Sequence, residues 1–365
     1  MSEWQTFCLK DLVKIFGGST PPTNNPKNYG NKIRWITAKD LSTLQGRYIE
    51  KGSRSISRLG FKSCSTFLLP KHAILFSVRA PIGYTAIISK RSCTDRGLMG
   101  LVPNKKIYFE FLYYLLKYHK DNISNMGVGT TFKGISKPAL GLFEVKIPPT
   151  YYEQQKIART LSILDQKIEN NHKINELLHT LAYKIYEYYF KYKPKNAKLE
   201  QIIIENPKSS IMVKNAQKTQ DKYPFFTSGD NILSYPKAII DGRNCFLNTG
   251  GNAGIKFYVG KASYSTDTWC ICANEFSDYL YLLLSSIKTH INQSFFQGTS
   301  LKHLQKNLLK KYPIYMPSAH EIKKFNQIIM PLLTLISINT RTSKKLEQIR
   351  DFLLPLLLKQ QVKPQ

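Results

Sequence analysis

Two long stretches of the chain repeat apolar residues at spacings of three and four, which is the period of an amphipathic helix. The first stretch begins after Pro149 and the second after Pro317. Each opens with a Thr or Ser three residues before a Glu, a pattern that caps a helix because the hydroxyl and the carboxylate take its free N–H groups. We therefore predict two helices of about 40 residues, each roughly 60 Å long at 1.5 Å per residue.

The two stretches are copies of one pattern, offset by 168 residues. A Gly-Thr pair precedes each copy, at 129–130 and at 298–299. Residues that match at the offset include Thr150 and Ser318, Glu153 and Glu321, Ile168 and Ile336, Asn171 and Asn339, and Leu178 and Leu346. Matched features of this kind indicate an internal duplication, so the chain is predicted to consist of two similar halves.

The apolar seam of each helix contains polar residues at matched positions, a device that fixes the register between paired helices. We predict that the two helices pack on each other as an antiparallel coiled coil. The alternative is that each helix caps only the core of its own half. Pro331 predicts a bend or a break, because an interior proline removes a backbone hydrogen bond. The predicted pairing and partner-docking residues are Leu161, Leu164, Ile168, Asn171, Leu178, Ile185, Ile329, Leu332, Ile336, Asn339, Leu346 and Leu353.

The segments before the two helices alternate short apolar runs with turn residues. In residues 1–150, strands are predicted at 33–36, 73–78 and 86–88, and a helix from about 108 to 118. In residues 194–317, strands are predicted at 244–247 and 255–259, and a helix near 279–288. The predicted fold class is α+β. Two α/β domains, 1–150 and 194–317, are separated by helical spacers at 151–193 and 318–365, with a pseudo-twofold internal repeat.

The chain carries a formal net charge of +29 at pH 7. Residues 1–150 hold 23 Lys or Arg against 8 Asp or Glu, and residues 194–317 hold 15 against 8. A basic surface displaces condensed counterions from nucleic acid, so a polyanion is the expected partner. The alternative is a Lys-rich chain with merely solvated faces. A membrane is not an expected partner, because the sequence has no apolar run of about 18 residues and its basic residues do not follow one helix face.

A search for catalytic motifs finds none that is complete. The stretch 127–131 resembles a phosphate-binding loop but lacks the lysine, and His320-Glu321 resembles a zinc-protease helix but has Lys324 in place of the second His. The six cysteines have no paired spacing, so free thiols in a reducing compartment are expected rather than a metal site. We predict a binding protein with no catalytic residues, no metal and no cofactor of its own.

Several motifs together resemble the specificity subunit of Type I restriction–modification systems, over essentially the whole chain. The most specific is the helix start Glu153-Gln154-Gln155-Lys156-Ile157. Others are GGSTP at 17–21, WITAKDL at 35–41, SVRAPIG at 77–83, YPFFTSG at 223–229 and YSTDT at 264–268. The chain departs from the family pattern at the second helix start, Glu321–Phe325, and at Asp95-Arg96-Gly97, where Asn-Gln-Gly is common.

The resemblance implies two target recognition domains, each reading one half of a split DNA site, and helical spacers that fix the distance between the halves. It also implies docking of two modification subunits, which bind S-adenosylmethionine and methylate adenine, and recruitment of restriction (translocase and endonuclease) subunits. The chain itself is then a non-catalytic, cytoplasmic subunit that binds double-stranded DNA. The alternatives are an orphan or regulatory DNA-binding protein and a freestanding DNA-modifying enzyme.

Basic and aromatic loop residues are the candidates for DNA contact. A phosphate contact or a solvated position is the alternative to base readout for any one of them. The candidates are Arg34, Arg54, Arg58, Lys62, Arg79 and Arg96 in the first domain, and Lys222, Tyr223, Arg243, Lys256, Tyr264 and Lys302 in the second.

Overall fold

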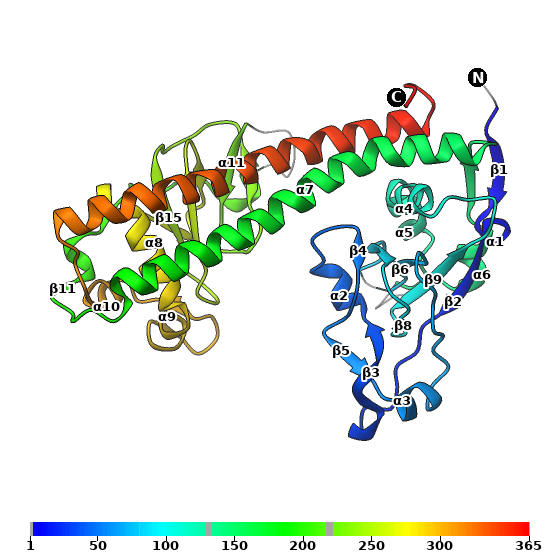
Figure 1. Cartoon of the computed structure of the whole chain (residues 1–365), viewed down its shortest axis with the longest axis horizontal. Helices are drawn as coiled ribbons and strands as arrows, with labels where there is room; N and C mark the ends of the chain where they lie inside the picture. Colours follow the sequence, from blue (N-terminus) through cyan, green and yellow to red (C-terminus); the bar gives the residue numbers. More distant parts are fainter. Residues whose placement is uncertain (1–2, 80, 129–132, 217–221, 365) are drawn as a thin grey trace. The chain divides into compact units, whose positions relative to one another are not determined.

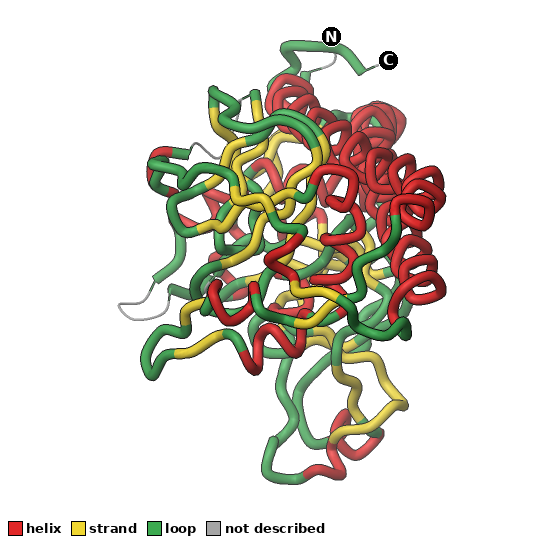
Figure 2. The backbone as a smooth tube through the Cα atoms, turned by 90° about the vertical axis from the view of Figure 1, so that its left-hand side faces the viewer, coloured by secondary structure: helices red, strands yellow, loops and turns green. Residues whose placement is uncertain are grey.

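The structure is a computed structural model, and it describes residues 3–79, 81–128, 133–216 and 222–364. The predicted Gly-Thr pair at 129–130 lies outside the described residues. The chain divides into two compact units: unit 1 comprises residues 1–169 and 349–365, and unit 2 comprises residues 170–348. Both units contain strands and helices, and Figure 2 colours the backbone by secondary structure. The four-segment division stays a prediction; the units group the chain differently, because each long helix contributes residues to both.

Unit 1 is built on a five-stranded sheet (Figure 1). Neighbouring strands are antiparallel except β4 and β7, which are parallel. The central strands consist almost entirely of buried apolar residues, as expected for a sheet covered on both faces. The strands are, in spatial order, β2 (Val13–Gly17), β9 (Leu98–Pro103), β6 (Ile74–Ser77), β7 (Thr85–Ile88) and β4 (Tyr48–Ile49).

Smaller elements complete unit 1. A three-stranded sheet has the order β5 (Arg54–Ile56), β3 (Tyr29–Ile36) and β8 (Cys93–Thr94), and β1 (Gln5–Cys8) pairs with β10 (Glu144–Ile147). The short helices are α1 (Leu9–Leu12), α2 (Ala38–Ser42), α3 (Arg58–Lys62), α4 (Phe109–Tyr118), α5 (Lys120–Asn125) and α6 (Lys137–Leu142). Helix α4 buries Phe111, Leu112 and Leu115 in the main core of the unit, which also contains Ile74 and Leu101 of the sheet.

Unit 2 has a four-stranded sheet and a three-stranded sheet. The four-stranded sheet has the order β12 (Ile204–Glu205), β18 (Thr268–Cys272), β15 (Arg243–Asn248) and β16 (Ile255–Val259). The three-stranded sheet has the order β14 (Leu233–Tyr235), β13 (Tyr223–Phe226) and β17 (Ser263–Tyr264). Two further strand pairs are β11 (Ala197–Lys198) with β21 (Pro313–Ile314) and β19 (Phe296–Gln297) with β20 (His303–Leu304), and the short helices are α8 (Ser277–Ser286), α9 (Lys288–Ser294) and α10 (Lys306–Lys310).

The internal repeat predicted from the sequence is confirmed at the level of whole elements. Helix α8 spans the residues of α4 shifted by 168 at both ends, and the long helices α7 (Tyr151–Tyr186) and α11 (Ala319–Leu358) start at the same offset. In both units a terminal strand pair, β1 with β10 or β11 with β21, precedes the long helix. The sheets also agree: β12-β18-β15-β16 repeats the antiparallel order β2-β9-β6-β7, and β14-β13-β17 repeats β5-β3-β8 with one antiparallel and one parallel pair. The two units are therefore built on one plan, and among the described residues β4 is an addition in unit 1.

Both long helices begin with the predicted hydroxyl cap, and at α11 both bonds of the capping box are present. The Glu153 amide donates to Thr150 Oγ1 at 3.2 Å at the start of α7. At the start of α11, the Glu321 amide donates to Ser318 Oγ at 3.3 Å and the Ser318 amide donates to the Glu321 carboxylate at 2.9 Å. These bonds use amides that the helix itself leaves without a partner, which explains why each helix begins where the sequence predicts.

In unit 2 the long helices pair antiparallel through the predicted polar positions. Asn171 donates from Nδ2 to Ser343 Oγ at 3.1 Å, and Asn339 donates from Nδ2 to Asn175 Oδ1 at 2.9 Å. Because 171 and 175 shifted by 168 give 339 and 343, the two bonds are copies of each other, which is the mark of an internal twofold relation. The seam of unit 2 also buries Ala182, Ile329, Leu333 and Ile336, with Leu178, Ile185 and Leu332 packed against them.

In unit 1 the first half of α7 packs on the last turns of α11. Leu161 is buried in the same core as Leu354, Leu357 and Leu358, with Leu353 packed against them. Of the other predicted pairing residues, Ile168 is buried, and Leu164 and Leu346 are half-buried in their respective units. The sequence prediction missed Leu333, Leu354 and Leu357, because neighbouring apolar residues satisfy the same spacing.

The sequence predicts a bend or a break at Pro331, and a break does not occur, since α11 is helical throughout Ala319–Leu358. A bend at this residue stays a prediction. Pro331 is exposed, while Ile329 and Leu333 on either side of it are buried. An interior proline costs about 3 kcal/mol, and full burial of one such apolar side chain stabilises by roughly 1.5–3 kcal/mol. Packing of the surrounding residues therefore outweighs the lost hydrogen bond.

Candidate nucleic-acid interface

A buried arginine fastens the sheet of unit 1 to helix α7. Arg47 is 3% exposed and stands immediately before β4. Its Nη1 contacts the Glu110 carboxylate at 3.1 Å, and its Nε and backbone amide donate to Glu169 Oε1 at 3.2 and 2.8 Å. Tyr48 and Tyr108 donate to the same Glu110 carboxylate at 2.6 and 2.9 Å. We call Arg47, Glu110 and Glu169 the first clamp.

Unit 2 contains a second clamp, formed by Arg243, Asp278 and Thr334. Arg243 donates from Nε and Nη2 to the two Asp278 oxygens at 2.6 Å each, a bidentate pair, and from Nη1 to Thr334 Oγ1 of α11 at 2.9 Å. Asp278 is 1% exposed, and burial raises the pKa of this carboxyl while the guanidinium opposes the rise. Paired Arg and carboxylate groups are stable in such places only when both are present.

The two clamps share one matched position of the internal repeat, the carboxylate, although their arginines come from different places: Arg47 precedes β4, and Arg243 begins β15. Glu110 and Asp278 lie 168 residues apart, each near the start of the short helix of its unit. In each unit an arginine from the sheet joins this carboxylate to the long helix. The clamps therefore set how each sheet is held against its own long helix, and they orient the loops that the sheet carries.

The predicted DNA-binding cations of unit 1 are all accessible. Arg34, Arg54, Arg58, Lys62, Arg79 and Arg96 are exposed. Arg34 and Arg54 belong to the neighbouring strands β3 and β5, where Arg34 lies opposite Ser55 and Arg54 lies opposite Trp35. Since side chains alternate along a strand, Arg34 and Arg54 lie on opposite faces of this sheet. Arg54 also stacks over the Tyr29 ring at 4.0 Å, which holds its guanidinium in place.

The predicted DNA-binding residues of unit 2 divide into two groups. Lys222 and Lys302 are exposed and Tyr223 is half-buried, so all three are accessible. Arg243 is committed to the second clamp. Lys256 donates from Nζ to the Thr227 carbonyl at 2.9 Å and to Asn248 Oδ1 at 3.0 Å, and burial lowers its pKa.

Tyr264 is also a structural residue. It is 1% exposed, its hydroxyl donates to the Pro207 carbonyl, and burial raises its pKa to about 12. Tyr264, Arg243 and Lys256 therefore support the domain, and the expectation that they face DNA is corrected. The sequence gives residue type but not burial, and these three residues lie on or beside strands whose faces the pattern did not resolve. Whether the accessible residues contact DNA stays a prediction.

The histidine, cysteine and carboxylate side chains of the described residues are dispersed. Among them no group of three or more His, Cys, Asp or Glu side chains is placed to hold a metal ion. The six cysteines are free. Over the same residues, no helix has the length and apolar character needed to cross a membrane. In each unit, exposed cations lie on a domain whose sheet is held to a long helix by a buried arginine–carboxylate contact.

Two similar units, each rich in exposed cations and each containing segments of both long helices, define a protein with an internal duplication. The family described as the Type I restriction modification DNA specificity domain matches residues 1–180 and residues 195–348. The chain belongs to this family, and the match falls once on each half of the repeat.

Relatives and a solved structure agree with this assignment. The chain is similar to the Type I restriction enzyme MjaIX specificity subunit of Methanocaldococcus jannaschii, with 29% identity over 98% of this chain and 93% of the relative. It is also similar to the putative type I restriction enzyme MjaX specificity subunit of the same organism, with 32% identity over 50% of this chain and 41% of that relative. A Type I restriction–modification S subunit from M. genitalium has the same fold, with a TM-score of 0.63, 18% identity and coverage of 98% and 96%.

Proposed function

We propose that this chain is the DNA-recognition subunit of a Type I restriction–modification complex and that each unit reads one half of a bipartite double-stranded site. The observation that carries the proposal is the duplicated plan, in which two family-matching halves each present exposed cations on a sheet clamped to a long helix. Phosphate contacts would set the position of each unit on DNA, and base-edge contacts would set the sequence.

The chain's own part in this function is placement, without catalysis and without a cofactor. S-adenosylmethionine would be bound by two modification subunits, which methylate adenine, and restriction subunits would join the same complex. DNA as the partner and the absence of complete catalytic motifs from the sequence support this division of labour. We place the complex in the cytoplasm, where this partner is accessible.

The proposal is tested by mapping adenine methylation in cells that express the modification subunit with and without this chain. A split motif that appears only with the chain is the expected result. Incubating the purified chain alone with labelled S-adenosylmethionine and DNA tests the rival of a freestanding enzyme, for which label transfer is expected. A chain that binds its site but supports no methylation with its partner would favour the rival of an orphan recognition protein.

An exposed apolar stripe on α7 fits the docking of a modification subunit. Ile174, Leu177 and Leu181 are 43%, 70% and 48% exposed, and their spacing places them on one helix face. Exposed apolar surface of this kind is typical of protein interfaces. Leu177→Asp is expected to lower co-purification of the modification subunit at least tenfold while leaving the thermal unfolding of the chain unchanged. Glu176→Lys, a charge change at an exposed position of the same helix that is not three or four residues from any member of the stripe, is the control. Equal loss in both variants, or no loss in either, contradicts the docking site.

A further inference from the structure

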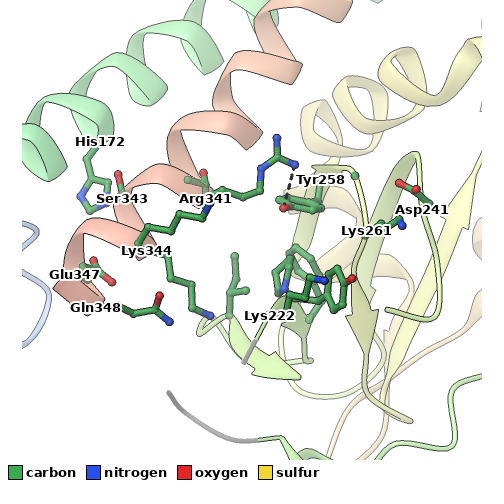
Figure 3. A pocket seen from close by; sticks show the side chains of 17 residues that line it. His172, Lys222, Asp241, Tyr258, Lys261, Arg341, Ser343, Lys344, Glu347 and Gln348 are labelled. Carbon is green, nitrogen blue, oxygen red and sulfur yellow. Dashed lines mark hydrogen bonds between the residues drawn. The ribbon is translucent and has the colours of Figure 1, made fainter. Parts of the chain in front are cut away.

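Unit 2 contains a cavity of about 990 Å³ between helix α11 and the sheets of the same unit (Figure 3). One wall is the α11 segment 340–348, and the opposite wall includes Tyr223 of β13 and Tyr258 of β16. His172 of α7 also lines the cavity, and its Nδ1 atom is buried without a hydrogen-bond partner among the described residues.

The lining of this cavity is strongly basic. Lys222, Lys261, Arg341, Lys344 and Lys345 contribute five cations, whereas Asp241 and Glu347 contribute two carboxylates. Among the described residues, four of these cations form no ion pair with either carboxylate, namely Lys222, Lys261, Arg341 and Lys345. Lys344 donates hydrogen bonds to residues of β14. An excess of cations around an open cavity attracts an anionic ligand, and aromatic walls are common in sites that bind nucleic acid.

Two of the cations are held in place by the domain. Arg341 donates from Nη1 to the Val259 carbonyl at 3.1 Å and to the Tyr258 hydroxyl at 3.4 Å, and its guanidinium lies over the Tyr258 ring. Both bonds use Nη1, and no acceptor among the described residues bonds its Nε or Nη2. Lys344 donates from Nζ to the Leu233 carbonyl at 3.1 Å and to Ser234 Oγ. Ordered cations lose little further entropy when they bind phosphate, and a guanidinium can do so with two donors.

The cluster is absent from the first copy of the repeat. The residues 168 positions before Arg341, Lys344 and Lys345 are Lys173, Glu176 and Leu177. Some scaffold positions do keep their residue type in both copies, as Glu110 and Asp278 keep a carboxylate. The reversal of charge at Glu176 and Lys344 shows that the fold does not require a basic cluster at this position of the helix.

We infer that this cavity binds phosphate groups of a DNA strand, so that α11 contributes DNA contacts in addition to carrying the domain. The inference rests on the proposed function and deepens it, because it assigns a phosphate-binding role to a helix otherwise regarded as a spacer. Lys222 and Tyr223, predicted from the sequence to contact DNA, lie at the same cavity. A free nucleotide offers the same phosphate chemistry, and a cavity of this volume is also large enough for one.

The test measures how salt affects binding of the full-length chain to a fluorescent duplex that contains its mapped site. The Lys261→Ala/Lys345→Ala variant removes two exposed cavity lysines that have no hydrogen bond or ion pair among the described residues. The slope of log binding constant against log salt is expected to fall in magnitude by about 0.9 for each phosphate that the variant no longer neutralises. The matched control is Lys323→Ala/Lys324→Ala, which removes two exposed lysines from α11 outside this cavity. An unchanged slope in the cavity variant, or an equal change in the control, overturns the inference.

A second measurement separates DNA from a free nucleotide. Magnesium-free ATP is titrated calorimetrically into the wild-type chain and the cavity variant without DNA. ATP binding that the variant loses while its DNA salt slope stays at the wild-type value would assign the cavity to a nucleotide and overturn the DNA inference. If the wild-type chain does not prefer its mapped site over a scrambled duplex, the proposed function fails. Phosphate binding by the cavity is still supported in that case if the salt slope on either duplex differs between the wild-type chain and the cavity variant.

Discussion

At the scale of single residues, arginines in this chain have two distinct roles. Arg79 and Arg96 are exposed and are free to meet a polyanion. Arg47 and Arg243 are bound to carboxylates that would otherwise be buried without a counterion. The difference decides what a substitution does, because removal of an exposed cation weakens binding, whereas removal of a clamp cation leaves a buried charge unpaired.

Arg243→Ala is therefore expected to destabilise the protein by about 3 kcal/mol, because Asp278 stays buried without its partner. Urea unfolding followed by circular dichroism measures this loss. Arg243→Met/Asp278→Leu removes both charges and is expected to recover most of the stability, since a buried pair replaced by apolar groups of similar volume is often neutral. Lys302→Ala is the control, because Lys302 is exposed and its removal is expected to leave stability unchanged. A wild-type unfolding midpoint for Arg243→Ala would show that the second clamp does not stabilise the fold.

At the scale of elements, the long helices and the short helices α4 and α8 were predictable, and the sheets were only partly so. Strong three-and-four periodicity and two capping boxes specify the long helices within a few residues. The strand order was not predictable, because β4 and β12 have two residues each and pair with strands distant in the chain. The first clamp was missed because Arg47, Glu110 and Glu169 are far apart in sequence. The signal that could have found its carboxylate is the 168-residue match between Glu110 and Asp278.

The cap of α11 predicts a specific dependence of stability on pH. Hydrogen bonds from Lys193, the Ser318 amide and the Tyr315 hydroxyl lower the pKa of Glu321 from 4.5 to about 2. A lowered folded-state pKa contributes stability that is present above the unfolded-state pKa and is lost as the pH falls toward the folded-state value. The contribution of Glu321 is therefore expected to be complete above pH 4.5 and to disappear between pH 4.5 and about 2.

Thermal melts of Glu321→Gln and the wild-type chain across this pH range test the dependence. The difference in melting temperature is expected to be largest above pH 4.5 and to shrink as the pH falls toward 2. Glu176→Gln, a substitution of a carboxylate that is exposed on α7, is the control for a general loss of negative charge. A difference that is constant with pH would contradict the role of the carboxylate in the cap.

The polar pair in the helix seam is expected to lower the stability of the protein while restricting the long helices to one register. Asn175 and Asn339 bond each other where apolar residues would pack more favourably. Asn175→Leu/Asn339→Leu is expected to raise the melting temperature and also to permit other helix pairings, seen as mixed oligomers by size-exclusion chromatography with light scattering. Thr180→Leu, at an exposed position of α7, controls for added apolar residues. A double variant that stays a single species of wild-type mass would contradict the register role.

At the scale of the whole molecule, the two copies of the repeat differ in the side chains that pack against the long helices. In unit 1, Tyr114 donates to Asp165 at 2.6 Å and Arg350 donates to Asp165 at 2.7 Å. The residues at the equivalent positions of unit 2 are Leu282, Leu333 and Ala182, which are all buried in its core. A helix segment paired with the wrong copy would bury Asp165 without Arg350, a costly arrangement. This difference specifies which segments pair, although the two helices share one pattern.

The two units also differ in the side chains they expose, so each is expected to determine only its own half of the DNA site. Arg79→Ala in unit 1 and Lys302→Ala in unit 2 remove exposed cations near different domains. If the side chain reads a base, the discrimination lost at one position is about 1–3 kcal/mol, and methylation mapping of the variant complex shows one half of the motif relaxed and the other intact. If the side chain contacts only a phosphate, the motif stays complete, binding weakens for every sequence, and the salt slope falls in magnitude by about 0.9. Relaxation of both half-sites by either single substitution would mean that the units do not read DNA independently, and the duplicated plan would then lose its functional meaning.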